Sequence, residues 1–187
     1  MKKQAIILAA MLAATAAHAD QQAAHAYVGV AAGLSHISID CTGSTSCDKT
    51  DTGGKLVGGY NFGNGFGLEA GYVSFGKGSA ADATLSATIK PAALTLGGVF
   101  ALPLGNEWGM NFRLGVARVK TKVDAALGAL HGPTESETRT KPYAGIGLTY
   151  ALSQAVKLEL AVDSTQGQFA GDKGSLRLIT AGATFAF

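Results

Sequence analysis

The amino-acid sequence predicts an all-β protein, an eight-stranded antiparallel up-and-down transmembrane β-barrel. Three observations support this prediction. Apolar residues alternate with small or polar ones over pieces of roughly ten residues, which is the period of a strand. The connections between these pieces alternate strictly between very short and long ones. Aromatic residues gather beside the short connections and at the C-terminus, where a membrane barrel carries an aromatic girdle.

The chain begins with the features of a secretory signal peptide, which is predicted to comprise residues 1–19. Two lysines precede an apolar stretch at 5–17, and an A-x-A cleavage motif ends at Ala19. A second A-x-A motif ends at Ala26, so cleavage at either position fits the pattern. The apolar stretch is too short to span a bilayer as a helix. The remaining residues, 20–187, form one predicted barrel domain.

The predicted mature chain has a balanced charge. The leader carries two of the 15 basic residues and none of the 13 acidic ones, which leaves 13 of each sign. The chain has no basic tract, so nucleic acid is not an expected partner. The sequence also offers no cluster of metal-ligating residues and no phosphate-binding loop, and we therefore expect neither a metal nor a cofactor.

Cys41 and Cys47 lie in the short segment CTGSTSC. An exported protein meets an oxidising compartment, in which a disulfide between them would persist. Metal binding is the competing interpretation, but no further Cys or His lies close by in the sequence to complete a ligand set. The sequence therefore predicts a disulfide and leaves its geometry open.

Eight strands are predicted, with the ranges 26–39, 55–63, 66–77, 84–104, 109–123, 140–152, 155–168 and 174–187. Among the first five, the alternation of apolar and polar residues differs in strength. In the third strand, Leu68 and Tyr72 share a face opposite Glu69. The fourth is the least regular, because its two prolines need positions without ladder hydrogen bonds. In the fifth strand, Phe112 lies opposite Arg113.

The last three strands alternate more regularly. The sixth sets Ile146 and Leu148 against two glycines. The seventh sets Leu158 and Leu160 against Lys157 and Glu159. The eighth carries apolar residues at every second position up to the terminal phenylalanine. This last strand is predicted to pair with the first, because a barrel has no free sheet edge.

Short and long connections distinguish the two rims of the predicted barrel. Three connections are very short, around 63–65, 105–107 and 153–154, and four are longer and polar, near 40–54, 78–83, 124–139 and 169–173. This pattern is typical of an up-and-down barrel with one tight rim and one rim of loops. The long loops are candidates for contact with other molecules, because recognition often lies on loops held by a rigid scaffold.

Two features indicate that the apolar face meets lipid. The opposite face is rich in Gly, Ala, Ser and Thr, which suits the narrow interior of an eight-stranded barrel. The aromatic residues that form the predicted girdle lie at the tight rim; they are Tyr60, Phe62, Phe66, Trp108, Tyr150, Phe185 and Phe187. Arg118 and Arg177 stand ten residues from this rim, at the opposite membrane interface. A soluble lipocalin-like barrel that buries the apolar face is the alternative.

Several stretches resemble the OmpA-like transmembrane barrels and their small relatives of the OmpX and Ail type. They are YVGVAAGLS (27–35), KLVGGYNF (55–62), GLEAGYVSFGK (67–77), FRLGVARVK (112–120), PYAGIGLTYAL (142–152) and the terminal phenylalanine. The resemblance covers nearly all of the chain after the leader. It implies a monomer in the bacterial outer membrane, surrounded by lipid and lipopolysaccharide and delivered by the outer-membrane insertion machinery through its C-terminal strand. The peptidoglycan-binding domain of full-length OmpA is not expected.

Four charged residues point inward by their parity along the strands: Glu69, Arg113, Lys157 and Glu159. Charges inside a narrow lumen must pair, because an unpaired buried ion is costly. The family resemblance implies interior salt bridges for such residues. They form either a plug that holds the barrel shut or a gate for a narrow solute pore. The plug is favoured, because eight strands leave room only for side chains.

The sequence therefore predicts a structural or surface-exposed outer-membrane protein whose loops are candidates for adhesion or host interaction. The alternatives are a narrow solute pore, a barrel enzyme that modifies lipid A, and a soluble secreted barrel. The enzyme alternative depends on His36 and Ser38, which share a strand face. No Asp or Glu is evident to orient this histidine, so catalysis is not expected.

Overall fold

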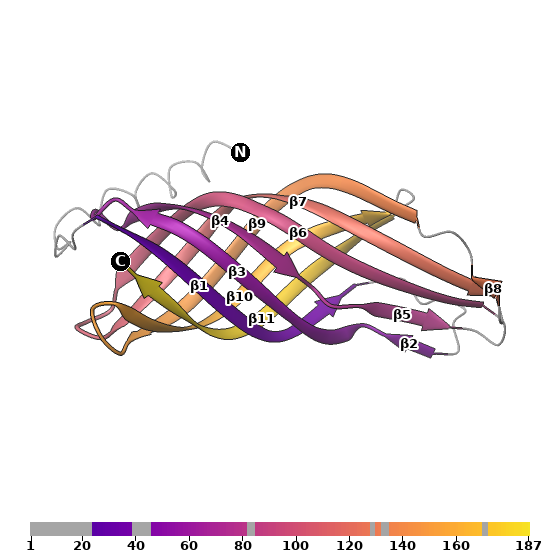
Figure 1. Cartoon of the computed structure of the whole chain (residues 1–187), viewed down its shortest axis with the longest axis horizontal. Coiled ribbons are helices and arrows are strands. Elements are labelled where there is room, and N and C mark those ends of the chain that lie inside the picture. The colour runs from indigo at the N-terminus through magenta and orange to yellow at the C-terminus, as the bar shows by residue number, and fades with distance from the viewer. Residues whose placement is uncertain (1–23, 39–45, 82–84, 128–129, 132–134, 170–171) are drawn as a thin grey trace, which may run out of the picture.

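The computed structural model describes residues 24–38, 46–81, 85–127, 130–131, 135–169 and 172–187. They form one antiparallel sheet of 11 strands that closes into a barrel (Figure 1). The barrel wall consists of β1 (His25–Ile37), β3 (Thr50–Asn61), β4 (Phe66–Ser74), β6 (Leu85–Pro103), β7 (Trp108–Leu127), β9 (Glu135–Ala151), β10 (Val156–Phe169) and β11 (Asp172–Ala186). The prediction of an eight-stranded antiparallel barrel is confirmed. The described residues include no helix with the length and apolarity needed to cross a membrane.

Three short strands lengthen the sheet beyond the barrel wall at one end, which we call the loop end. They are β2 (Ser46–Asp48), β5 (Gly78–Ala81) and β8 (Leu130–His131). Figure 1 shows them together with the outer parts of β6 and β7, far from the C-terminus. The opposite end carries the short connections, and we call it the short-turn end.

The barrel closes through its first and last strands. β1 pairs with β11 along eleven residue positions, from Tyr27 opposite Ala186 to Ile37 opposite Leu176. The backbone N–H of Phe187 then donates a hydrogen bond of 3.0 Å to the carbonyl of Ala26. The last residue is therefore tied to the first strand, as the absence of a free edge requires.

The connection between β3 and β4 shows why the short turns are tight. Gly63 and Gly65 have φ values of 81° and 82°, which residues with a side chain rarely adopt. Asn61 and Asn64 accept hydrogen bonds from backbone N–H groups two residues further on, at 2.8 and 3.1 Å. Such Asn-centred turns fix the loop without further contacts.

The outer face of the barrel is apolar, as predicted. Leu158, Leu160, Phe112 and Phe185 remain 43%, 57%, 36% and 45% exposed. A soluble barrel would bury these side chains, so the lipocalin-like alternative is wrong. Exposed apolar side chains on all sides of a barrel fit a lipid environment.

The loop end differs from the prediction, because much of the segments expected as loops is strand. β7 continues to Leu127 and β9 begins at Glu135, so the expected loop at 124–139 narrows to a hairpin tip. β6 and β7 stay in register out to Leu85 opposite Leu127. Polar composition does not prevent backbone pairing, and beyond the membrane both faces of a ribbon can be hydrated.

The wall is incomplete between β9 and β10 at the loop end. Their pairing ends at Ala144 opposite Ser164, although both strands continue. The carbonyl of Pro142 accepts a hydrogen bond of 2.8 Å from the Thr165 hydroxyl of β10. In a strand the N–H and C=O of one residue point the same way, so the donor that proline lacks would have faced β10. The ladder between β9 and β10 therefore ends at Ala144 and does not reach Pro142.

The interior has two tiers, which the sequence did not predict. The half toward the short-turn end is polar and charged. The half toward the loop end is an apolar tier, formed by Ile37, Val73, Phe75, Ala93, Ala117, Val119, Tyr143, Leu176 and Leu178. The small and polar residues that the sequence analysis expects inside the barrel thus account for only part of its interior. Ile37, Val73 and Phe75 lie at the loop-end termini of β1 and β4 or just beyond them, whereas the other members lie within longer strands that continue past this tier.

Candidate functional site

The polar half of the interior, toward the short-turn end, is called the polar tier. It is organised around Arg113 of β7. Its Nε lies 2.9 Å from Oε1 of Glu69, and its Nη2 lies 2.7 Å from Oε2 of Glu159. These carboxylates project from β4 and β10, on different sides of the lumen. All three side chains are at most 7% exposed, so one guanidinium bridges the barrel interior away from water.

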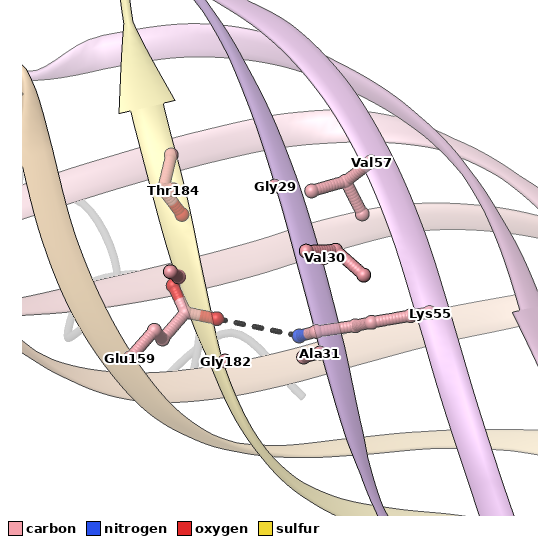
Figure 2. Close-up of a pocket in the computed structure, with 9 residues that line it drawn as sticks. Gly29, Val30, Ala31, Lys55, Val57, Glu159, Gly182 and Thr184 are labelled. Atoms are coloured by element: carbon pink, nitrogen blue, oxygen red, sulfur yellow. Dashed lines mark hydrogen bonds and ion pairs between the residues drawn. The ribbon is translucent and has the colours of Figure 1, made fainter.

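Lys55 of β3 supplies the second cation. Its Nζ lies 2.7 Å from Oδ2 of Asp163 and 3.3 Å from Oε1 of Glu159. In Figure 2 the long lysine side chain reaches across β1, beside Ala31, toward Glu159. Glu159 thus joins the two cations into one network.

Neutral donors complete the hydrogen bonding of the carboxylates. The hydroxyl of Tyr27 donates to Glu69 at 2.9 Å, and that of Tyr143 donates to Asp163 at 2.6 Å. Nδ2 of Asn111 lies 2.9 Å from Glu159. Each carboxylate therefore has both a cation and a neutral donor, which is what a buried ionic cluster requires to avoid a large desolvation penalty.

Two glycines of β9 make room for the network. A Cβ on Gly145 would collide with Oδ1 of Asp163. A Cβ on Gly147 would lie 3.1 Å from Cδ of Glu159 and 3.3 Å from Nη1 of Arg113. The inward glycines of this strand are thus explained by the charges that they face.

The network leaves little free space. The cavity beside Lys55 and Glu159 has a volume of ≈ 10 Å³, which is at the lower limit for one water molecule. The residues around this cavity come from β1, β3, β10 and β11. The side chains themselves fill the lumen at this level.

The structure brings together three of the four charged residues singled out in the sequence. Lys157 is half-buried on the inward side of β10, two residues nearer the short-turn end than Glu159, and forms no ion pair with any described residue. Lys55 and Asp163 were missed, although both have inward parity. With Lys157 included, the described residues of the polar half of the lumen comprise three cations, Lys55, Arg113 and Lys157, and three carboxylates, Glu69, Glu159 and Asp163.

The predicted girdle residues lie at the short-turn end. Tyr60, Phe62, Phe66, Trp108, Phe185 and Phe187 are exposed, and Tyr150 is half-buried. The rings of Trp108 and Tyr150 lie 4.9 Å apart. Phe100, which the sequence analysis did not include, lies 4.9 Å from Phe66 and extends the girdle toward Phe112.

The other predicted residues fall outside this network. His36 is exposed on the outer face, with Arg177 and Thr50 as its cross-strand neighbours. The Ser38 hydroxyl lies 2.9 Å from that of Ser175. Cys41 lies outside the described residues, so the disulfide with Cys47 stays a prediction. Within the described ranges, no group of three or more His, Cys, Asp or Glu residues is placed to hold a metal ion.

Comparisons with known proteins agree with this architecture. A family model described as an outer membrane protein beta-barrel domain matches residues 5–187. Among solved structures, the attachment invasion locus protein Ail of Yersinia pestis, in complex with the heparin analogue sucrose octasulfate, has a TM-score of 0.58 at 17% identity. The match covers 89% of this chain and 100% of that one. A search of curated proteins found no match.

Two further solved structures have the same fold. Neisserial surface protein A has a TM-score of 0.60 at 15% identity, covering 89% of this chain and 100% of that one. The outer membrane protein OprG of Pseudomonas aeruginosa has a TM-score of 0.54 at 17% identity, covering 89% and 97%. At these identities the likeness establishes the barrel fold.

Proposed function

Because the chain belongs to the outer membrane protein β-barrel family, and so lies in the bacterial outer membrane, we propose that it is a closed anchor which presents an extracellular β-sheet. In such barrels the short turns face the periplasm and the loops face outward. The single observation that carries the proposal is the filled lumen, in which a charged network and an apolar tier follow one another. A barrel filled in this way holds its outer sheet rigidly.

The filled lumen favours a plug over a narrow pore. A hydrated ion would have to separate Arg113 from two carboxylates and then pass Phe75 and Leu178, which are 1% and 0% exposed. Breaking the ion pairs alone would not open a path, because the apolar tier lies beyond them. Apolar constrictions exclude ions by remaining dry.

The sheet at the loop end supports a surface role. A tilted strand needs about 9–11 residues to cross the hydrocarbon, whereas β7 comprises 20 residues. The excess projects beyond the membrane together with β2, β5 and β8. We propose that this sheet and its connecting loops mediate adhesion or contact with host molecules. The binding of a heparin analogue by Ail makes sulfated polysaccharides a reasonable first ligand class to test.

The remaining parts of the proposal concern assembly and chemistry. Up to Ala144 opposite Ser164 the ladder is closed from β1 to β11 and leaves no free edge in the barrel wall, which favours a monomer. We propose that the C-terminal strand, ending on Phe187, is what the insertion machinery recognises. A catalytic role is not proposed, because His36 lies between Arg177 and Thr50 with no carboxylate beside it among its cross-strand neighbours.

Conductance in planar bilayers tests the closed lumen. The wild-type protein and Glu69→Gln are expected to show no stable channels, because the apolar tier remains. A triple variant that combines Phe75→Ala and Leu178→Ala with Glu69→Gln loosens both the apolar tier and the ion pairs, and it is expected to give measurable steps. Stable wild-type channels that change with Glu69→Gln would establish the pore instead. Folding of each variant is checked by its faster gel mobility before boiling.

Binding of cells that express the protein to immobilised heparin and to cultured host cells tests the surface role. The variant replaces the β7–β9 tip, residues 125–133, by Gly-Ser-Gly, and is compared at equal surface amounts. Reduced binding is expected because the sheet loses its outermost part. Binding equal to that of the wild type, or no binding by either protein, would remove the adhesive role and leave only the anchor.

A further inference from the structure

The short turn between β3 and β4 contains a chemically labile pair, Asn64 followed by Gly65. The backbone nitrogen of the residue after an asparagine can attack the side-chain amide carbon Cγ. The new C–N bond closes a five-membered succinimide ring, and the side-chain nitrogen leaves as ammonia together with the proton of the attacking N–H. Water then opens the ring to aspartate, or to isoaspartate, in which the main chain runs through the side-chain carbons.

The attacking nitrogen is available at this position. The N–H of Gly65 donates a hydrogen bond to no other described residue, and glycine has no side chain to hinder ring closure. Asn64 is exposed, so water reaches its amide and can accept the proton. The nucleophile, the amide carbon and the solvent therefore meet in one turn.

The side-chain carbonyl of Asn64 is polarised by the backbone. Its Oδ1 accepts a hydrogen bond of 3.1 Å from the N–H of Phe66. Negative charge develops on this oxygen when Cγ becomes tetrahedral, and a donor that is already in place stabilises such charge. The turn thus supports the attack on the amide carbon.

Asn61 lies in the same turn and provides an internal comparison. Its Oδ1 accepts a hydrogen bond of 2.8 Å from the N–H of Gly63, so its amide is polarised in the same way. The next residue is Phe62, whose N–H donates to the carbonyl of Phe66 at 2.8 Å. This nitrogen must lose a hydrogen bond before it can attack, and the phenylalanine side chain crowds the ring. Asn61 should therefore persist where Asn64 reacts.

We propose that Asn64 is a site of spontaneous deamidation in the folded barrel, so that the protein slowly acquires aspartate or isoaspartate in this turn. Aspartate retains an oxygen for the Phe66 N–H and adds a negative charge at the short-turn end. The proposal is independent of whether the lumen conducts or the loops bind other molecules.

Isoaspartate has the larger structural effect, because it adds a carbon to the backbone of a closed turn. The Phe62 N–H donates to Phe66 across this turn at 2.8 Å. The Ala101 N–H of β6 donates to the carbonyl of Gly65 at 2.7 Å. Both bonds depend on the present length of the backbone. Conversion to isoaspartate therefore loosens the β3–β4 turn and its contact with β6 as the protein ages.

Peptide mass spectrometry of the folded protein, incubated in detergent micelles at mildly alkaline pH, tests the proposal. Trypsin releases one peptide, residues 56–77, that contains both Asn61 and Asn64. Fragment ions then assign the mass gain of about 1 Da to one of the two residues. Asn64 is expected to convert at least about tenfold faster than Asn61, because Phe62 must first lose its hydrogen bond and also hinders the ring. Asn64→Gln cannot close a five-membered ring and is expected to gain no mass there.

The same incubation of the protein unfolded in urea separates the turn from the sequence. The ratio of the two rates is expected to fall there, because the Phe62 N–H is no longer bound to the carbonyl of Phe66. In the folded protein, amide exchange at Phe62 and Ala101 is expected to be faster after long incubation than before it. An Asn64 amide that stays intact in the folded barrel but converts in urea, or equal conversion of both asparagines, would overturn the proposal. Unchanged exchange in converted protein would refute the loosening of the turn.

Discussion

Replacing Arg113 by methionine tests whether the interior network stabilises the barrel through its ion pairs. The guanidinium makes ion-pair contacts of 2.9 and 2.7 Å with carboxylates of β4 and β10, and its side chain is 4% exposed. Methionine keeps much of the side-chain volume, so packing changes little. The variant leaves Glu69 and Glu159 buried with a net excess of negative charge.

The size of the effect can be estimated from these contacts. Two unit charges about 4 Å apart attract by about 4 kcal/mol at an effective dielectric constant of 20. Two such contacts are lost, but methionine does not bear the desolvation cost of the guanidinium. Removing one partner from a buried ion pair accordingly costs about 3–5 kcal/mol, and we expect the free energy of unfolding to fall by this amount.

Reversible urea unfolding in phospholipid vesicles measures this loss. Trp108 is the single tryptophan of the chain, and it lies at the membrane interface, so its fluorescence reports the transition. Lys157→Met is the matched control, because it also removes an inward cation but breaks no described ion pair; we expect it to cost less than about 1 kcal/mol. Combining Arg113→Met with Glu69→Gln and Glu159→Gln is expected to recover most of the loss.

The reasoning fails if Arg113→Met and Lys157→Met destabilise the barrel equally, since ion pairing would then contribute nothing specific. It also fails if neutralising both carboxylates does not restore stability. Either result would mean that the stability contributed by the polar tier depends on the volume of its side chains and not on their charge.

Three further predictions concern other parts of the barrel. Leu114→Arg places a charge near the middle of the lipid-facing side and is expected to cost about 2–4 kcal/mol in the same unfolding assay. Phe75→Ala empties part of the apolar tier and is expected to cost about 3–5 kcal/mol, with a smaller loss if the site collapses. At the loop end, the backbone N–H groups of Thr52 and Lys77 donate to Asp51 and hold the pKa of its carboxyl below the usual range. This stabilisation is present above the unfolded-state pKa and is lost as pH falls through the lowered folded-state pKa. The protection of the Lys77 amide relative to its intrinsic exchange rate should therefore fall there, and Asp51→Asn should remove the pH dependence of this protection.

The sequence predicted the wall of the barrel well, because lipid imposes one rule on every strand. Each residue between Trp108 and Arg118 that faces outward must be apolar, and this repeats as a period of two. The same alternation places Arg113 inward without any knowledge of its partners. Closure followed from the same logic, since the last strand had only the first to pair with.

The interior was harder to predict, because its order depends on contacts between distant strands. Parity alone would have added Lys55 and Asp163 to the inward charges, but only the register shows that they meet. Leu176 and Leu178 alternate with Arg177 and Ile179, so the pattern of β11 loses its contrast where the interior becomes apolar. Local alternation cannot separate two apolar faces.

The interruption between β9 and β10 shows a further limit of the sequence. Proline at position 142 excludes one hydrogen bond, but the sequence does not reveal toward which neighbour the missing donor points. That direction follows from the Thr165 hydroxyl, which donates to the proline carbonyl. β9 therefore stops pairing with β10 along one edge, while its other edge remains paired with β7 out to Glu135.

The two interior tiers depend on each other through Tyr143. Its ring belongs to the apolar tier, and its hydroxyl donates to Asp163 at 2.6 Å. The apolar tier keeps water of the loop end away from the ion pairs, and ion pairs strengthen as the local dielectric constant falls. Opening that tier with Phe75→Ala should therefore weaken the network as well as its own packing. We expect the double variant Phe75→Ala with Arg113→Met to lose less stability than the two single losses combined, because the first substitution already hydrates the charges whose pairing the second removes.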